Sequence, residues 1–159
     1  MKKLIIFCKI FIFCTGIPFS AAYPSSYYIK DHLVIDLKQN IEWLRCSVGQ
    51  IWNGDNCVGE VLLMDHDTIR QAIIIANEQL GDGWRLPSLD ELSELVCHKC
   101  PPPKIDQKAF PNTDRRAYWT GERNNLVKRS YWTVNFFTGH KFGRFFPEQE
   151  MAVRLVRDR

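Results

Sequence analysis

The chain has 159 residues, with 21 Lys and Arg against 18 Asp and Glu and a formal net charge of +3. This length is enough for one domain with a single core and too short for two. So small a net charge argues against nucleic acid as a partner, because nucleic acid is bound by strongly basic surfaces.

The N-terminal segment predicts a signal peptide over residues 1–22. Residues 1–3 form a basic start, residues 4–19 are mostly apolar, and small residues at 20–22 provide a cleavage site. Lys9 interrupts the apolar run, and the stretch that follows it is shorter than the ~20 residues that a spanning helix needs. We therefore expect a secreted or periplasmic protein with no membrane span after cleavage. An uncleaved anchor is the alternative.

Removal of this leader changes the charge balance. It takes away three basic residues and no acidic ones, so the 137 residues left of the 159 carry no net charge. Residues 23–103 hold 6 basic and 12 acidic side chains, whereas residues 104–159 hold 12 basic and 6 acidic ones. The imbalance predicts a dipolar molecule with one basic region.

After a linker of residues 23–32, a single domain is expected over residues 33–159. It opens with an alternating strand at 33–37, and a second short strand follows at 41–44.

Four cysteines remain after cleavage: Cys46, Cys57, Cys97 and Cys100. An even number of cysteines in a small exported domain indicates disulfide bonds. We favour Cys46–Cys57 and Cys97–Cys100, because each pair brackets a turn-rich loop. A zinc site that uses all four and a redox role for the second pair are the alternatives. The redox role is disfavoured because that pair follows a predicted helix instead of opening one.

The first predicted helix covers residues 66–80, where apolar residues recur at helical spacing. Asp65 or Asp67 can cap its start, and a Gly-Asp-Gly sequence at 81–83 ends it.

A second helix starts at Ser88, which forms a capping box with Glu91, and the prolines at 101–103 stop it. The segment before it, 84–87, is extended because it ends in proline. Its apolar side chains are expected in the core, and Arg85 is expected to pair with a carboxylate or a carbonyl.

The C-terminal part predicts a meander of strands at 118–120, 131–136, 141–145 and 151–155. Strands, two helices and then more strands give an α+β fold class.

Four separated motifs in this chain resemble the Lcl-type C-terminal domain, a family of exported bacterial domains of unknown function. The motifs are Trp43-Leu44-Arg45-Cys46 with Gly49-Gln50, Trp52-Asn53-Gly54 and Cys57; Gly83-Trp84-Arg85-Leu86-Pro87 with Glu91-Leu92; Phe110-Pro111-Asn112-Thr113 with Tyr118-Trp119-Thr120; and Val153-Arg154-Leu155-Val156-Arg157. Their order and spacing agree with the family over residues 33–159.

The resemblance implies a C-type-lectin-like domain, related to formylglycine-generating enzymes, with two helices, a small twisted antiparallel sheet and a binding face made of loops. The collagen-like adhesin that gives the family its name implies binding to sulfated glycans, although this chain has no collagen-like stalk. Formylglycine-generating enzymes use cysteines late in the fold, and this chain has none after Cys100. We therefore expect a binding domain and not an enzyme.

No residue pattern points to catalysis, a metal or a cofactor. The four histidines, His32, His66, His98 and His140, are isolated from one another in the sequence. Calcium could be ligated by the side chains of Asn53, Asp55 and Asn56, but a plain turn is the favoured interpretation of that segment.

The basic half of the chain carries the functional hypothesis. Guanidinium groups bind sulfate and carboxylate in bidentate fashion, and aromatic rings stack on sugars. The candidate ligand-binding residues are Arg115, Arg116, Tyr118, Arg123, Lys128, Arg129, Tyr131, Lys141 and Arg144. We expect them to form a surface for an acidic glycan. A solvated face balanced by acids such as Asp114 and Glu122 is the alternative.

A second function is considered beside it. The pairs Phe136-Phe137 and Phe145-Phe146 could anchor a protein partner, so that the domain would be a subunit of an envelope complex or an inhibitor of a secreted factor.

Overall fold

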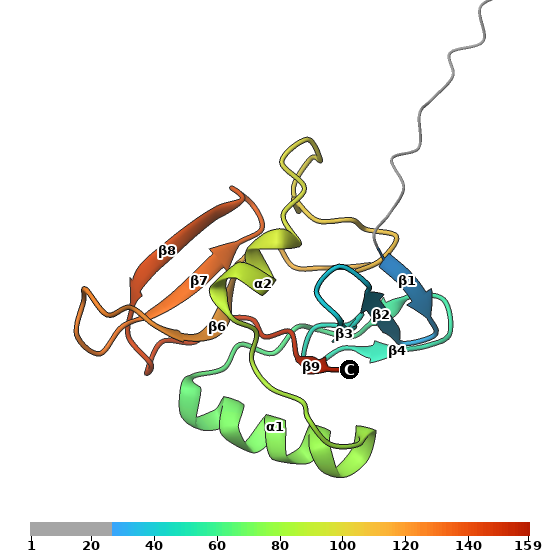
Figure 1. The fold of residues 1–159 in the computed structure, drawn as a ribbon, viewed down its shortest axis with the longest axis horizontal. Helices are drawn as coiled ribbons and strands as arrows, with labels where there is room; N and C mark the ends of the chain where they lie inside the picture. The colour runs from blue at the N-terminus through green and yellow to red at the C-terminus, as the bar shows by residue number, and fades with distance from the viewer. Residues whose placement is uncertain (1–26) are drawn as a thin grey trace, which may run out of the picture.

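A computed structural model describes residues 27–159, and Figure 1 shows its fold. The predicted signal peptide lies outside the described residues. Within residues 27–159, no helix is long and apolar enough to cross a membrane.

The chain opens and closes in one four-stranded antiparallel sheet. Its strands are β1 (Tyr27–Lys30), β2 (Leu33–Asp36), β3 (Ile41–Leu44) and β9 (Val156–Asp158), in the order β1-β2-β3-β9. Strand β1 was assigned to a linker from the sequence, and that assignment is wrong because its four residues pair with β2 from Tyr27↔Asp36 to Lys30↔Leu33. Both predicted strands at 33–37 and 41–44 are confirmed, the first of them ending one residue early.

A disulfide-closed hairpin follows this sheet. Strands β4 (Ile51–Trp52) and β5 (Cys57–Val58) pair antiparallel, and the disulfide between Cys46 and Cys57 closes the segment. The second disulfide joins Cys97 to Cys100 after the second helix. Both predicted pairings are confirmed.

The two helices begin where their caps predict. Helix α1 (His66–Leu80) is capped by Asp65, whose carboxylate accepts a hydrogen bond from the Thr68 amide at 2.8 Å, and it ends at Gly81 with φ of 90°. Helix α2 (Leu89–Glu94) has the predicted capping box between Ser88 and Glu91. The structure is therefore α+β with small antiparallel sheets, as the order of elements predicts.

A three-stranded meander forms the other side of the molecule (Figure 1). Its strands are β6 (Ala117–Arg123), β7 (Tyr131–Asn135) and β8 (His140–Phe145), in the order β6-β7-β8. The closing strand expected at 151–155 is wrong. That segment runs between other elements and makes only isolated bridges, such as Met151 with Met64 and Ala152 with Tyr118, before β9 starts at Val156.

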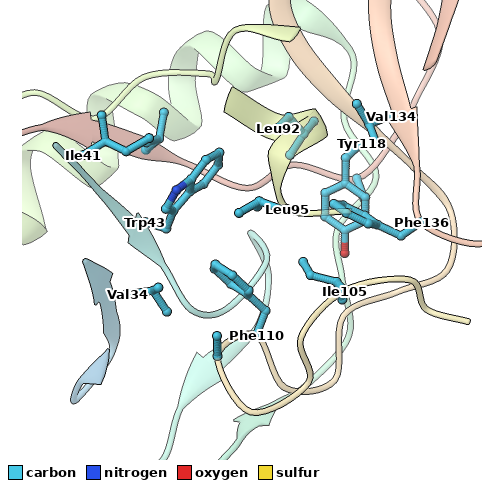
Figure 2. Packing of buried hydrophobic residues seen from close by; sticks show 13 residues of the cluster. Val34, Ile41, Trp43, Leu92, Leu95, Ile105, Phe110, Tyr118, Val134 and Phe136 are labelled. Atoms are coloured by element: carbon cyan, nitrogen blue, oxygen red, sulfur yellow. The ribbon is translucent and has the colours of Figure 1, made fainter. Parts of the chain in front are cut away.

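Two hydrophobic clusters make up the core. Figure 2 shows the first, where Trp43 lies edge-on to Phe110 with ring centroids 6.4 Å apart. The second gathers around Trp84 and Trp119 beneath α1. Strand β6 belongs to both, because Tyr118 packs into the first cluster and Trp119 into the second. The first half of this strand is therefore buried on both faces, whereas its last three residues, 121–123, are exposed.

One charged side chain lies fully buried beside these clusters. The Arg154 guanidinium donates to the carbonyls of Leu44 and Arg45 and to the hydroxyls of Ser47 and Thr113. It has no carboxylate partner among the described residues, and burial lowers its pKa to about 10. Through these hydrogen bonds, the buried side chain of Arg154 links the end of β3 to the segment that precedes β9.

Candidate functional site

The predicted ligand-binding residues fall into two groups at opposite ends of β6. Arg115 and Arg116 precede this strand, whose seven residues at about 3.3 Å each extend over roughly 20 Å. Arg123 ends it, directly opposite Tyr131 of β7, which in turn pairs with Phe145 of β8.

The group at the far end of β6 is the denser one. We call it the distal basic surface, and it consists of Arg123, Lys128, Arg129 and Arg144. All four side chains are exposed. Arg129 binds Glu148 at 2.5 Å, whereas Arg123, Lys128 and Arg144 have no carboxylate partner within residues 27–159. Three cations are therefore available to an anion at this end of the sheet.

An aromatic stack supports Arg123 from below. Its Nε donates to the Tyr131 hydroxyl at 3.0 Å, and its guanidinium carbon lies 5.4 Å from the centre of the Tyr131 ring. Tyr131 lies against His66, with ring centroids 3.9 Å apart, and His66 meets Trp119 edge-on at 4.7 Å. Tyr131 is half-buried, so it positions Arg123 more than it offers a stacking face.

His66 is the member of this arrangement that the sequence did not reveal. It is the first residue of α1 and is buried, and its Nε2 has no hydrogen-bond partner within the described residues. Burial lowers its pKa, and the charges of Arg70 and Arg123 lower it further. The ring is thus neutral at pH 7 and serves as a packing surface beneath Tyr131.

The loop between β6 and β7 carries Lys128 and Arg129 on a hydrogen-bonded framework. The Asn124 side chain donates to the Gly143 carbonyl at 2.7 Å and accepts from the Leu126 amide at 2.9 Å. The Ser130 hydroxyl donates to the Val127 carbonyl at 2.7 Å. These contacts join the loop to β8 and hold its shape.

The remaining candidates lie elsewhere or are inaccessible. Arg116 pairs with Asp114 at 3.4 Å, and Lys141 pairs with Asp90 of α2 at 3.4 Å. Tyr118 is fully buried, and its hydroxyl accepts from the Asp114 amide and is bonded to Ser47. Its inclusion in a ligand surface is therefore corrected, since no face of the ring reaches solvent.

The four phenylalanines expected to anchor a protein partner differ in their exposure to solvent. Phe136 is buried and Phe145 is half-buried against Trp119, so only Phe137 and Phe146 of the two pairs are exposed.

A hollow that the sequence did not predict lies between α1 and the β4 region. We call it the apolar groove; its volume is about 640 Å³. Its lining is mainly aliphatic and includes Val48, Ile51, Leu62, Ala72, Ile75 and Leu80. Asp31 lies at one end, where its carboxylate accepts a hydrogen bond from the Trp52 indole at 2.8 Å. The volume is in the range of ordinary ligand sites.

The turn considered for calcium is explained by its own hydrogen bonds. The Asn53 side-chain oxygen accepts from the amides of Asp55 and Asn56 at 3.0 and 2.8 Å. Among the residues that the structure describes, no three His, Cys, Asp or Glu side chains are grouped for a metal ion. The two hydrogen bonds to the Asn53 side chain are those of a plain Asx turn.

Comparison with known proteins agrees with the resemblance seen in the sequence motifs. No curated protein and no solved structure matches the chain. The family model for the Lcl C-terminal domain matches residues 32–157. Since this match covers most of the chain, the protein belongs to the Lcl C-terminal domain family.

Proposed function

We propose that this protein is an exported, non-enzymatic recognition domain that binds acidic or sulfated polysaccharide at the distal basic surface. The observation that carries the proposal is the group of three exposed cations, Arg123, Lys128 and Arg144, without carboxylate partners in the described structure. The C-type-lectin-like arrangement and the secreted or periplasmic location implied by the sequence belong to the same proposal.

Several weak contacts, made together, account for such binding. One exposed ion pair contributes ~0.2–1 kcal/mol, so a single sulfate would not be retained. A polyanion that spans this end of the sheet can contact several of these cations at once, and the contacts then add. The guanidinium of Arg123 is partly oriented by Tyr131, which reduces the entropy lost on binding.

The test is retention of the oxidised, exported protein on immobilised heparin at low salt. A triple variant, Arg123→Ser, Lys128→Ser and Arg144→Ser, should elute at much lower salt than the wild type. The matched control is Arg115→Ser, Arg116→Ser and Lys141→Ser, which removes the same charge from other positions. Elution of the control close to the wild type supports a localised site. Equal loss in both variants, or wild-type flow-through at low salt, contradicts it.

The apolar groove supports the second candidate function, a protein-interaction module of the envelope. Its aliphatic lining resembles the apolar centre of a protein interface more than a sugar site. A variant that loses a protein partner through a groove substitution, with heparin retention unchanged, would favour this function over the first.

A further inference from the structure

The disulfide between Cys97 and Cys100 lies on a loop that projects from the end of α2, on the side away from α1 (Figure 1). His98 and Lys99 separate the two cysteines, and both of these residues are exposed. Cys97 and Cys100 are themselves half-buried, so each is partly in contact with solvent. A thiol from another molecule can therefore approach this bond while the domain is folded.

The disulfide between Cys46 and Cys57 differs from it in burial. Cys57 has no exposed surface. Attack on this bond would have to reach the Cys57 sulfur or release it as a thiolate inside the core. An apolar environment disfavours a thiolate, so both routes are unfavourable in the folded domain. The two disulfides should therefore exchange at very different rates.

Hydrogen bonds hold the shape of the Cys97–Cys100 loop without the disulfide. The Cys100 amide donates to the Cys97 carbonyl at 3.1 Å, and the Cys97 amide donates to the Lys104 carbonyl at 2.9 Å. The Lys104 amide donates to the carbonyl of Phe136, which follows β7, at 2.7 Å. The Lys104 ammonium group donates to the carbonyls of His98 and Cys100 at 3.1 and 3.3 Å. Because none of these contacts involves sulfur, reduction leaves them in place, and the two thiols stay close enough for the bond to form again.

Basic side chains around this loop favour a thiolate. A redox-active cysteine pair often starts a helix, whose dipole stabilises the thiolate, whereas this pair follows one. Residues 97–104 instead contain His98, Lys99 and Lys104, and no Asp or Glu. The β7–β8 turn packs against this loop, and residues 136–144 contain no Asp or Glu either. Positive charge next to the sulfurs lowers the free energy of a leaving thiolate.

The nearest acidic residues along the chain are bound elsewhere. Glu94 of α2 pairs with Lys38 at 2.6 Å. The Asp106 carboxylate accepts a hydrogen bond from the Lys108 amide at 2.9 Å. The charged group that contacts the backbone of the disulfide loop is therefore the Lys104 ammonium.

We propose that Cys97–Cys100 is a thiol-exchange site that accepts two electrons from a dithiol of another exported protein. A thiolate of the partner attacks one sulfur of the pair and forms a mixed disulfide, while the Cys97–Cys100 bond breaks and the second sulfur leaves as a thiolate. The other thiol of the partner then attacks the mixed disulfide, so the partner departs with a disulfide of its own. Two electrons and two protons have then passed to the Cys97–Cys100 pair. The transfer is stoichiometric and does not involve the distal basic surface.

The experiment measures how fast dithiothreitol, as the dithiol probe, reduces each disulfide in the folded, oxidised, exported protein. Samples are quenched with iodoacetamide, peptide mass spectrometry identifies the alkylated cysteines, and tryptophan fluorescence reports on the fold. Cys97–Cys100 should be reduced at least about tenfold faster than Cys46–Cys57, with unchanged fluorescence. Replacement of dithiothreitol by oxidised glutathione should restore the Cys97–Cys100 bond.

Variants of Lys104 distinguish assistance by charge from exposure alone. Lys104→Gln should slow the reduction of Cys97–Cys100 about threefold, because the leaving thiolate loses a nearby cation. Lys104→Arg keeps the charge and should react close to the wild-type rate. Lys108→Gln is the matched control, since it removes an exposed charge four residues further along the chain, and it should react as the wild type does.

Several outcomes would overturn the proposal. These are equal reduction rates for the two disulfides, reduction of Cys97–Cys100 only after the fluorescence shows unfolding, and failure of the bond to form again. A Lys104→Gln variant that reacts as fast as the wild type would also overturn it. Heparin retention of the protein reduced at Cys97–Cys100, measured separately, reports on the polysaccharide site alone, so the two proposals can fail independently.

Discussion

Removal of the Cys46–Cys57 disulfide should destabilise the domain more than removal of Cys97–Cys100. The two bonds close loops of different length, with sequence separations of 11 and 3. If a disulfide acts by restricting the unfolded chain, the longer loop contributes about 2.8 kcal/mol and the shorter about 1.6 kcal/mol. The double variants Cys46→Ala/Cys57→Ala and Cys97→Ala/Cys100→Ala should therefore differ by about 1.2 kcal/mol in free energy of unfolding.

The structure adds to this difference. Cys57 is fully buried, and its carbonyl accepts a hydrogen bond from the Asn112 side chain at 2.8 Å. Loosening the β4–β5 hairpin would weaken this link to the rest of the domain, so 1.2 kcal/mol is a lower limit for the difference.

The assay is urea unfolding followed by tryptophan fluorescence, with the slope of the transition compared between variants. An equal or greater loss for the Cys97/Cys100 variant would refute the loop-length argument. The oxidised wild type should also unfold at higher urea than the reduced wild type. If reduction leaves the midpoint unchanged, the cysteines of the native protein are not paired, and the inference of an oxidising compartment fails with it.

Two further predictions concern buried polar groups. The pKa of His66 is lowered in the fold, so below about pH 6.5 the unfolded chain takes up a proton that the buried ring does not. The free energy of unfolding of the wild type should therefore fall between pH 7 and 5.5. His66→Phe should make that fall smaller. Urea midpoints at both pH values measure this, and an unchanged profile would show that His66 does not titrate as proposed. Glu91→Gln should lower the free energy of unfolding by about 1.5–3 kcal/mol. The reason is that the Glu91 carboxylate accepts two hydrogen bonds from Arg85, at 2.8 and 2.9 Å, and one from the Ser88 amide. Glu94→Gln, which removes only the exposed Lys38–Glu94 pair, should cost less than about 1 kcal/mol in the same unfolding assay, and equal costs would contradict the difference in burial.

Local signals account for the parts of the fold that the sequence predicted well. Asp65 and Ser88 cap the helices because a side-chain oxygen satisfies a free amide at each start, and this depends only on the next few residues. The disulfides were predictable because both pairs are close in sequence. The prediction that Arg85 pairs with a carboxylate or a carbonyl is confirmed, since it binds Glu91 and Asp158 and donates to the Leu86 carbonyl.

Features that depend on distant partners were missed. Strand β1 has three exposed residues in a row, so no alternation marks it, and its pairing with β2 decides its structure. The apolar groove is assembled from four separate parts of the chain. Basic residues surround Tyr118 in the sequence and predicted a surface position, but the first half of β6 lies between two core clusters and is covered on both faces.

The position of β9 has a consequence for biogenesis. Strand β3 pairs with β9 from Ile41↔Asp158 to Trp43↔Val156, so one edge of β3 finds its partner only after the helices and the three-stranded meander have been made. During synthesis, that edge of β3 stays unpaired until β9 has emerged. The sheet is therefore completed late, and a truncation that removes β9 would leave the nascent domain open to proteolysis.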